Sequence, residues 1–385
     1  MSQPFLVFAA PDIQEEEIAE VEACLRSGWL GTGPRVARFE KEFAAYKGLE
    51  AGQATAMNSC TAAMHVSMIA SGLSPGAEVI TTPLTFCATV NAIIHAGLTP
   101  VLADIDPLTQ NIDPAAIEAA ITPRTEAILP VHFAGRPCDM DAILAIARKH
   151  KLRVIEDCAH AIETEYKGRK AGTIGDIGCF SFYVTKNVVT GEGGMVLARD
   201  PALVARARML ALHGMSKDAW HRFSDKGYRH YEVLECGFKY NMMDIQAALG
   251  IHQLARVETA WERRRSIWAR YQQALSELPV GLPAPFEDDT RHACHLYAIQ
   301  VHADCAGLSR DQFLDRMTAQ GIGTGVHYLP IAWHPFYQER FGWDPDAWPH
   351  AKLAGLGTVS LPLSSRLRDE DVERVITAVG RVVGG

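Results

Sequence analysis

The segment with the most unusual chemical potential is Ser181-Phe182-Tyr183-Val184-Thr185-Lys186-Asn187, followed by Gly191-Glu192-Gly193-Gly194. Its lysine comes directly after an apolar run that has the pattern of a buried strand. Burying an unpaired ammonium group is costly, and the lowered pKa of a buried lysine suits it to form a Schiff base with a carbonyl compound. Gly193 and Gly194 allow a tight backbone path before the next strand. The alternative is a lysine exposed on a turn after an edge strand, which Lys186 taken alone would favour.

A second candidate segment is Ile155-Glu156-Asp157-Cys158-Ala159-His160. Asp157 is expected at the carboxyl end of a parallel strand, which is where α/β folds bind ligands. Pyridoxal 5′-phosphate (PLP) needs an acidic partner for its pyridinium nitrogen so that its ring can act as an electron sink. Asp157 fits that role, and His160 could support it or face the ring. The alternative is that Asp157 caps a following helix.

A third segment, Asn58-Ser59-Cys60-Thr61-Ala62-Ala63, joins an expected strand to an expected helix. Such a junction points backbone N–H groups at an anion and suits a phosphate, although an ordinary Ser/Thr helix cap has the same composition. In the next junction, Pro83-Leu84-Thr85-Phe86, the Phe86 ring could stack on a planar cofactor or lie in the core. With a hydroxyl at Ser181, these segments together form a candidate PLP site.

The elements that must position these residues follow an alternating pattern. From about residue 53 to residue 200, short apolar runs alternate with helical stretches, which predicts a mainly parallel sheet with helices on both faces. The expected strands are Gln53–Asn58, Glu78–Thr81, Pro100–Ile105, Ala127–Val131, Arg153–Ile155, Gly178–Phe182 and Met195–Ala198. The expected helices between them are Thr61–Ser71, Ala88–Ala96, Ala115–Ile121 and Asp139–His150. The candidate residues fall at or near strand ends, where such a sheet gathers a binding site.

The pattern changes after about residue 240. The expected elements there are one or two long helices over Asp244–Leu275, a strand at Leu296–Val301, and helices at Arg310–Gln320 and Asp369–Val383. We therefore predict an α/β fold with a large PLP-binding domain, residues 1–243, and a smaller α+β domain, residues 244–385. The polar and aromatic stretch Lys217–Glu232 is predicted to be a loop.

The bulk composition argues against several classes of protein. The chain has 385 residues, 48% of them apolar, and a formal net charge of −8, which argues against nucleic-acid binding. The tightest basic cluster, Arg263-Arg264-Arg265, lies among helix formers and is typical of a solvated helix face. Nine cysteines without CxxC spacing disfavour a disulfide framework or a zinc site. The first residues do not resemble a signal peptide and no apolar run reaches the ~18 residues that span a bilayer, so we expect a cytoplasmic protein that does not bind membranes.

The order of these residues resembles that of the DegT/DnrJ/StrS family of sugar aminotransferases, which have the aspartate-aminotransferase fold, or PLP fold type I. The resemblance covers nearly the whole chain and rests on Ser27–Pro34, Thr61, Phe86, Asp157-x-x-His160, Ser181-x-x-x-x-Lys186-Asn187, Gly191-Glu192-Gly193-Gly194, Lys239-Tyr240-Asn241 and Gly323–Tyr328. Within the family, Ile121-Thr122-Pro123-Arg124-Thr125 and Gly321–His327 are most similar to the enzymes that make UDP-4-amino-4-deoxy-L-arabinose. Tyr183 departs from the His that is common at that position.

The resemblance implies a role for each matching position around the cofactor ring. Lys186 would be the catalytic residue, which forms the Schiff base with PLP and then moves the proton during transfer. Asp157 would pair with the pyridine nitrogen. Phe86, where relatives often have Trp or Tyr, would stack on the ring, and His160 would lie near it.

The resemblance also implies how the phosphate and the sugar are held. Cys60, Thr61 and Ser181 would bind the phosphate. Asn241 would reach across an interface to the phosphate bound by the neighbouring subunit, which implies an obligate homodimer with shared active sites. The sugar side would be lined by Gly31, Thr32, Tyr183 and His327.

The expected activity is the transfer of an amino group from L-glutamate to a nucleotide-linked 4-keto sugar, with UDP or dTDP as the nucleotide. A 3-keto sugar, or a keto sugar without a nucleotide, fits the sequence as well. A catalytically silent, PLP-binding regulatory protein is a second class, against which the intact Lys186, Asp157 and Ser181 count. A dinucleotide-binding oxidoreductase is a third, suggested by Gly31-x-Gly33, but these glycines follow an expected helix, Glu15–Arg26, and no strand.

Overall fold

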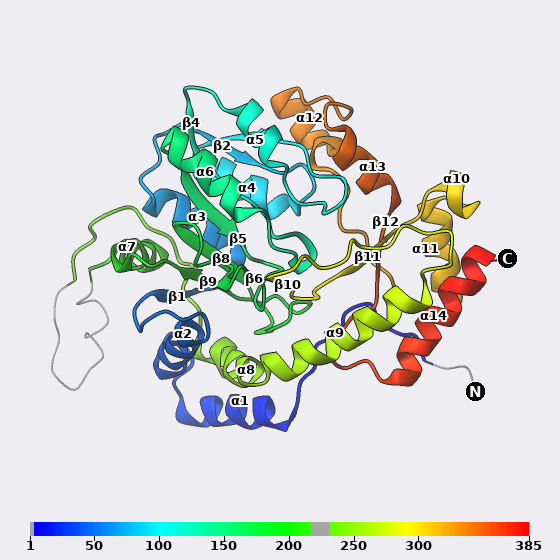
Figure 1. Cartoon of the computed structure of the whole chain (residues 1–385). Helices are drawn as coiled ribbons and strands as arrows, with labels where there is room; N and C mark the ends of the chain where they lie inside the picture. Colours follow the sequence, from blue (N-terminus) through cyan, green and yellow to red (C-terminus); the bar gives the residue numbers. More distant parts are fainter. Residues whose placement is uncertain (1–3, 217–230, 385) are drawn as a thin grey trace.

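The computed structural model describes residues 4–216 and 231–384, and within them a seven-stranded sheet forms the centre of the molecule (Figure 1). In spatial order its strands are β1 (Ala54–Met57), β9 (Gly194–Leu197), β8 (Ile177–Ser181), β5 (Arg153–Asp157), β4 (Thr125–Ile128), β2 (Glu78–Thr81) and β3 (Thr99–Leu102). All neighbours pair in parallel except around β9, which runs antiparallel to both β1 and β8. The predicted α/β fold class with a mainly parallel sheet is confirmed, and all seven predicted strands are present.

Helices cover both faces of this sheet, so most of its strand residues are buried on either side. One face packs against α3 (Cys60–Ala70), α4 (Cys87–His95) and α7 (Pro201–Ala211). The other face packs against α2 (Pro34–Tyr46), α5 (Pro114–Ala120), α6 (Met140–His150) and α8 (Asp244–Ala255). In β8 the alternation is visible residue by residue, because Ile177 and Cys179 point to the first face and Phe180 to the second.

A second hydrophobic cluster forms around a two-stranded antiparallel sheet. Its elements are β11 (Tyr297–Gln300), β12 (Thr358–Leu361), α11 (Arg310–Ala319), α14 (Asp369–Gly384) and the carboxyl half of α9 (Val257–Ala274). Sequence patterns missed α2, α7 and β12. They also missed α10 (Ala303–Ala306), α12 (Pro335–Phe341), α13 (Pro349–Gly357) and a three-stranded sheet of β6 (Glu165–Tyr166), β7 (Arg169–Lys170) and β10 (Thr290–Arg291).

Of the one or two long helices predicted over Asp244–Leu275, the structure has two, α8 and α9, with Arg256 between them. Helix α8 packs with α1 (Glu15–Ser27) and α2 beside the seven-stranded sheet. Helix α9 extends to the two-stranded sheet of β11 and β12. The division of the chain at residues 243 and 244 therefore stays a prediction. The predicted loop Lys217–Glu232 lies outside the described residues except at its carboxyl end.

The prediction that Arg263-Arg264-Arg265 marks a solvated helix face is wrong for its middle residue. Arg264 is 3% exposed and forms an ion pair with Glu163, which is 1% exposed. A buried charge is tolerated when it is paired. This part of α9 therefore faces the interior, where its charge is held next to the segment that follows Lys186, because Glu163 also accepts a 2.8 Å hydrogen bond from Asn187.

The N-terminal segment, residues 6–12, is a strap that connects the region of the two-stranded sheet to the region of α8. Leu6 donates its N–H to the Gly321 carbonyl (2.9 Å) and accepts from the Gly323 N–H (2.8 Å), near the two-stranded sheet. At the other end of the strap, the Asp12 carbonyl accepts from Gln253 and Arg256 of the α8 region, each at 2.7 Å. A Cβ on Gly323 would lie 3.0 Å from the Leu6 carbonyl oxygen, so the absence of a side chain at Gly323 allows the strap to pack this closely.

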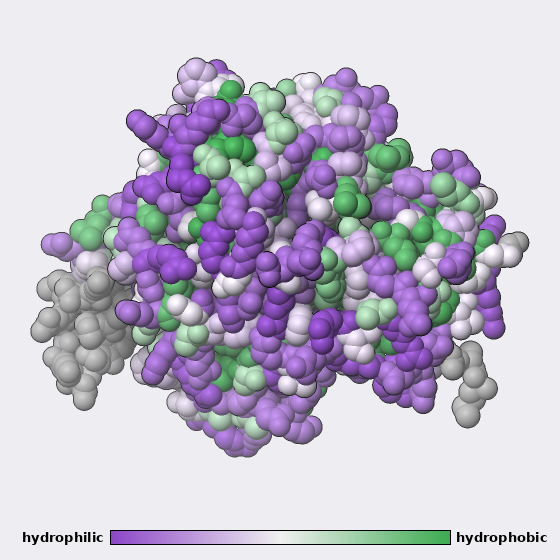
Figure 2. All heavy atoms as spheres, in the orientation of Figure 1, coloured by the Kyte–Doolittle hydropathy of each residue, from purple (hydrophilic) through white to green (hydrophobic). Residues whose placement is uncertain are grey.

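The outer surface is mixed in character. On the face shown in Figure 2, hydrophobic residues form small groups separated by hydrophilic ones. Among the described helices, none combines the length and the apolar composition needed to cross a membrane.

Candidate active site

Lys186 lies in a turn that directly follows β8, and β8 is an interior strand between β9 and β5. The Lys186 N–H donates to the Tyr183 carbonyl (2.8 Å), which closes the turn. The side chain is partly buried. Burial lowers the pKa of Lys186 to about 8, against the opposing effects of Cys60 and Asp157. The alternative of an exposed lysine after an edge strand is therefore wrong.

Asp157 is the last residue of β5 and is 3% exposed. Its Oδ2 accepts a 2.9 Å hydrogen bond from the Thr89 hydroxyl, and its Oδ1 accepts from the Ala159 N–H at 3.0 Å. A turn follows, with no helix for the carboxylate to cap, so that alternative is wrong. Burial raises the pKa of Asp157, whereas its two hydrogen bonds and the positive charge of Lys186 favour the ionised form.

The first turn of α3 lies against the start of β9. Ser59 is the cap of α3, and its hydroxyl accepts from the Ala62 N–H at 3.1 Å. The predicted helix cap is therefore present, and it is Ser59. The Ser59 hydroxyl does not bind the next two N–H groups, those of Cys60 and Thr61. A Cβ on Gly194 would lie 2.4 Å from the Ser59 carbonyl oxygen, so only glycine lets β9 approach this helix start so closely.

Two further residues of the predicted phosphate side are buried near the helix start. Ser181, at the end of β8, is 6% exposed, and its hydroxyl accepts from the Tyr183 N–H at 3.3 Å. Burial raises the pKa of the Cys60 thiol far above its usual value, so this cysteine stays neutral and packs as a small apolar group.

Phe86 is not a core residue, since 58% of its surface is exposed. Its ring centroid lies 6.0 Å from that of Tyr328. The Tyr328 hydroxyl lies 3.0 Å from Nε2 of His160, and the His160 ring packs at 4.4 Å from the ring of His295. Phe86 is thus an accessible ring above a buried layer of polar aromatic side chains.

His327 lies next to this layer. Its Nδ1 is 2.9 Å from the Ser360 hydroxyl, and its ring stacks on Phe8 of the N-terminal strap with centroids 5.5 Å apart. Burial lowers the pKa of His327 to about 4, and the charge of Lys186 acts in the same direction. At neutral pH His327 is therefore an uncharged hydrogen-bonding side chain.

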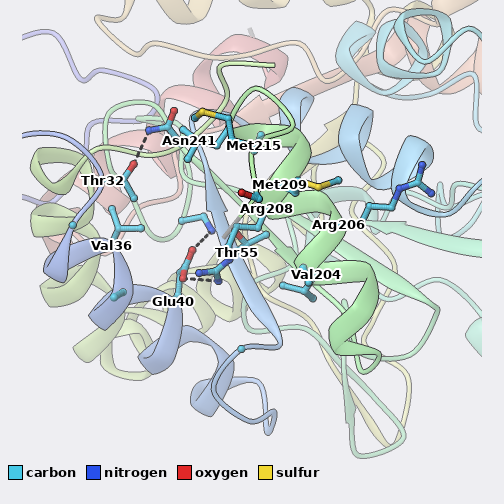
Figure 3. A pocket seen from close by; sticks show the side chains of 18 of the residues that line it. Thr32, Val36, Glu40, Thr55, Val204, Arg206, Arg208, Met209, Met215 and Asn241 are labelled. Atoms are coloured by element: carbon cyan, nitrogen blue, oxygen red, sulfur yellow. Dashed lines mark hydrogen bonds and ion pairs between the residues drawn. The ribbon is translucent and has the colours of Figure 1, made fainter. Parts of the chain in front are cut away.

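Asn241 and Thr32 lie together in another part of the structure. Asn241 donates a 2.6 Å hydrogen bond to the Thr32 hydroxyl, which donates to the Met242 carbonyl at 2.5 Å. Both residues line a cavity of about 1110 Å³ between α2 and α7, which Lys186 does not line (Figure 3). Gly31, on the same segment as Thr32, accepts at its carbonyl from the N–H of Asp244.

The carboxylate of Asp244 holds the segment that carries Thr32. It is fully buried and accepts from the N–H groups of Gly33, Arg35 and Val36 at 2.8 to 3.1 Å. Tyr183, the last of the predicted sugar-side residues, is 44% exposed. The structure therefore groups Lys186, Asp157, His160, Phe86 and His327 on one side, and Thr32 with Asn241 on another.

Several residues of this site were missed by sequence reasoning. Thr89 binds Asp157 from one turn after Phe86, and that spacing was its only signal. Tyr328 stands at the end of a motif whose His327 was singled out. His295, whose Nδ1 lies 3.0 Å from Oδ1 of Asn187, carried no signal at all.

The described residues fit PLP. The cofactor combines a phosphate, an aldehyde, a pyridine nitrogen and a ring hydroxyl. The site offers a helix start, an amine of lowered pKa at Lys186 and a buried acid at Asp157. It also holds a buried polar atom with no hydrogen-bond partner among the described residues, Nδ1 of His160.

Known proteins are similar to this chain in both sequence and fold. The profile of the DegT/DnrJ/EryC1/StrS aminotransferase family matches residues 11–380. The chain is 52% identical over 383 residues to the spore coat polysaccharide biosynthesis protein SpsC of Bacillus subtilis strain 168, and the match covers 99% of this chain and 98% of SpsC. Spr1654 of Streptococcus pneumoniae, solved in its pyridoxamine phosphate (PMP) form, superposes with a TM-score of 0.91 at 32% identity, covering 100% of this chain and 99% of that one. PseC of Helicobacter pylori, an aminotransferase involved in the biosynthesis of pseudoaminic acid, gives a TM-score of 0.90 at 28% identity over 99% of both chains.

Proposed function

Because this chain belongs to the DegT/DnrJ/EryC1/StrS aminotransferase family, we propose that it moves the amino group of L-glutamate to carbon 4 of a nucleotide-linked keto sugar. Membership confirms the predicted PLP-dependent sugar aminotransferase of fold type I, and solved relatives include PLP and PMP forms. The resemblance to the L-arabinose enzymes in particular stays a prediction. The observation that carries the proposal is that one site holds both an amine of lowered pKa, Lys186, and a buried acid, Asp157, each of which affects the pKa of the other.

We assign the residues around the cofactor as follows. When bound, PLP supplies the electron sink that lets an amino group leave the donor and reach a keto carbon. Asp157 would face the pyridine nitrogen, and its hydrogen bonds from Thr89 and Ala159 favour the charged form needed there. Phe86 would cover the ring. The start of α3, with Cys60, Thr61 and Ser181, would bind the phosphate.

Lys186 would move the proton during both halves of the transfer. With a pKa of about 8, its Nζ is partly neutral near neutral pH, so it can accept a proton at one carbon and release it at another. General bases work best when their pKa lies near the working pH. The turn that follows β8 fixes the main chain from which the side chain of Lys186 extends.

A sugar as the amino acceptor is supported by the relatives and by the character of the site. SpsC is named for spore coat polysaccharide biosynthesis and PseC for pseudoaminic acid biosynthesis, so both act in the making of sugars. The side chains assigned to the sugar side, including Tyr183 and the uncharged His327, offer hydroxyl and imidazole groups that suit sugar hydroxyls. A 3-keto sugar, or a keto sugar without a nucleotide, remains the alternative substrate.

A homodimer with shared sites is part of the proposal. Asn241 and Thr32 line a large, mostly apolar hollow, and the neighbouring Trp29 is 49% exposed. Exposed apolar surface of this kind marks an interaction site, and a second copy of this chain is the partner we propose for it. The cytoplasmic location rests on the sequence alone and stays a prediction.

An absorbance spectrum of the purified enzyme tests the first half of the reaction. Adding L-glutamate should replace the visible band of the PLP form with the near-ultraviolet band of the PMP form, and 2-oxoglutarate should appear in equal amount. Supplying keto sugars to the PMP form, each with and without its UDP or dTDP group, then tests the second half. If the visible band returned with the keto sugar that lacks a nucleotide and not with its nucleotide-linked form, the nucleotide-linked assignment would be wrong. If a 3-keto sugar reacted faster than the 4-keto sugar, the assignment of carbon 4 would be wrong.

A further inference from the structure

Tyr328 and His160 form a pair whose geometry has a consequence for the cofactor. The Tyr328 hydroxyl lies 3.0 Å from Nε2 of His160. The other nitrogen of the ring, Nδ1, is buried and finds no hydrogen-bond partner among the residues the structure describes. A buried polar atom left without a partner costs free energy. In the loaded enzyme, a ligand atom is therefore expected next to Nδ1.

The protonation state of His160 follows from its surroundings. Burial lowers the pKa of His160 well below its usual value, and the positive charge of Lys186 acts in the same direction. The ring is thus neutral and carries one proton, on one of its two nitrogens. Burial also raises the pKa of Tyr328 above its usual value, with Asp157 acting in the same direction, so the phenol stays protonated.

The hydrogen bond of Tyr328 determines which nitrogen of His160 carries the imidazole proton. Within the described chain, Nε2 of His160 is the one acceptor that lies in reach of this hydroxyl. If the phenol donates to Nε2, then Nε2 bears the lone pair and the ring proton sits on Nδ1. The reverse arrangement would leave the Tyr328 hydroxyl without an acceptor among the described residues, which is the less favourable choice.

We propose that Tyr328 is a positioning residue: by donating to Nε2 of His160, it fixes the imidazole proton on Nδ1 and makes that nitrogen a hydrogen-bond donor to the bound PLP. The acceptor is the ring oxygen of the cofactor. The other polar groups of PLP are already assigned, since Asp157 takes the pyridine nitrogen, Lys186 the aldehyde carbon and the start of α3 the phosphate. This inference rests on those assignments and on PLP, and not on the identity of the sugar.

The packing around Tyr328 allows its hydroxyl to be removed alone. The ring contacts Phe133 edge-on, with centroids 6.3 Å apart, and Phe86 at 6.0 Å. Tyr328→Phe keeps both contacts and deletes only the donor. His160→Gln keeps an acceptor for Tyr328 and an N–H for the cofactor, whereas His160→Phe removes both.

The test follows the visible band of the PLP-loaded enzyme as a function of pH. A donor to the ring oxygen stabilises its deprotonated form, so losing the donor should move the midpoint of the band to higher pH. His160→Phe should raise the midpoint by about one pH unit, the effect of one hydrogen bond to a charged group. Tyr328→Phe should raise it by less, since some of the imidazole still carries its proton on Nδ1. His160→Gln should restore the wild-type value.

Non-additivity identifies an effect that passes through His160. In the double variant Tyr328→Phe/His160→Phe, the midpoint should equal that of His160→Phe alone, because Tyr328 then has nothing to orient. The matched control is Tyr337→Phe, which deletes a 2.7 Å hydrogen bond to Asn91 and should leave the midpoint unchanged. An unchanged midpoint in Tyr328→Phe, or an additive double variant, would overturn the inference.

A direct readout comes from nitrogen-15 spectra of the PLP-loaded enzyme with labelled histidine. The His160 signals, assigned by their loss in His160→Gln, should show the proton on Nδ1 in the wild type and a mixture of the two tautomers in Tyr328→Phe. A proton on Nε2 in the wild type would overturn the inference. Conversion to the PMP form by L-glutamate tests the proposed function separately, so the two can fail independently.

Discussion

The hydroxyl of Thr89, on α4, donates a 2.9 Å hydrogen bond to Oδ2 of Asp157, at the end of β5. Thr85, one turn earlier, lies 2.8 Å from the same hydroxyl and can donate to it, which leaves the Thr89 proton free for the carboxylate. The start of α4 thus favours the charged form of the acid proposed to face the pyridine nitrogen, against the effect of burial, which raises the pKa of Asp157.

Thr89→Val should weaken catalysis without unfolding the enzyme. Valine has nearly the shape of threonine but cannot donate, so the pKa of Asp157 should rise further and the pyridine nitrogen should lose part of its partner. We expect kcat to fall about tenfold, the effect of roughly one hydrogen bond to a charged group. The matched control is Thr81→Val, which removes a buried 2.8 Å hydrogen bond to the Leu129 carbonyl. Equal activity losses in the two variants would contradict the role of Thr89.

Covalent capture of PLP should depend on pH through Lys186. The neutral amine is the nucleophile, and burial lowers the pKa of Lys186 to about 8. The rate at which cofactor-free enzyme captures PLP should therefore rise with pH up to about 8 and level off above it. Stopped-flow absorbance measures this rate, and Lys186→Ala, which should fold yet lose nearly all turnover, supplies the blank. A rate that climbs on to pH 10, as for an exposed lysine with a pKa of about 10.4, would contradict the environment described.

Mixing two inactive variants should restore activity if the active sites are shared. In a dimer of one Lys186→Ala subunit and one Asn241→Ala subunit, one site carries both defects and the other carries neither. After random reassociation, about one quarter of wild-type activity should return, because half of the dimers hold one intact site. Transaminase activity before and after mixing measures the recovery. If Asn241 served its own subunit, no mixed dimer would hold an intact site, and activity would stay at the level of the parents.

Breaking the buried ion pair on α9 should destabilise the fold. Arg264→Met leaves the Glu163 carboxylate buried without its partner, and removing one member of a buried pair costs about 3–5 kcal/mol in the free energy of unfolding. Arg270→Met is the control on the same helix, since its pair with Glu373 is half exposed and should be worth at most about 1 kcal/mol. Urea denaturation, monitored by circular dichroism, compares the free energies of unfolding of the two variants. A similar decrease in both would mean that the buried pair stabilises the fold no more than the exposed one.

Much of the fold could be predicted because its signals are local. The seven strands were recognised from short apolar runs between helical patterns, and α5 from Asp113 and Pro114, which the structure shows as cap and first residue. Elements α12, α13 and β12 were missed because their sequences carry little periodic pattern, and they form by packing against other parts of the chain. Arg264 was misjudged for the same reason, since its helix pattern does not reveal that Glu163 lies opposite.

Local sequence patterns were enough to indicate which residues could do chemistry, because Lys186, Asp157 and the small residues around Thr61 stand at strand ends that these patterns reveal. The side chains that adjust those residues became known from the folded chain. Thr89 meets Asp157 across 68 residues of chain, and Tyr328 meets His160 across 168. Such pairings depend on how distant segments pack, and packing, burial and the resulting pKa shifts are properties of the folded chain that no local pattern records.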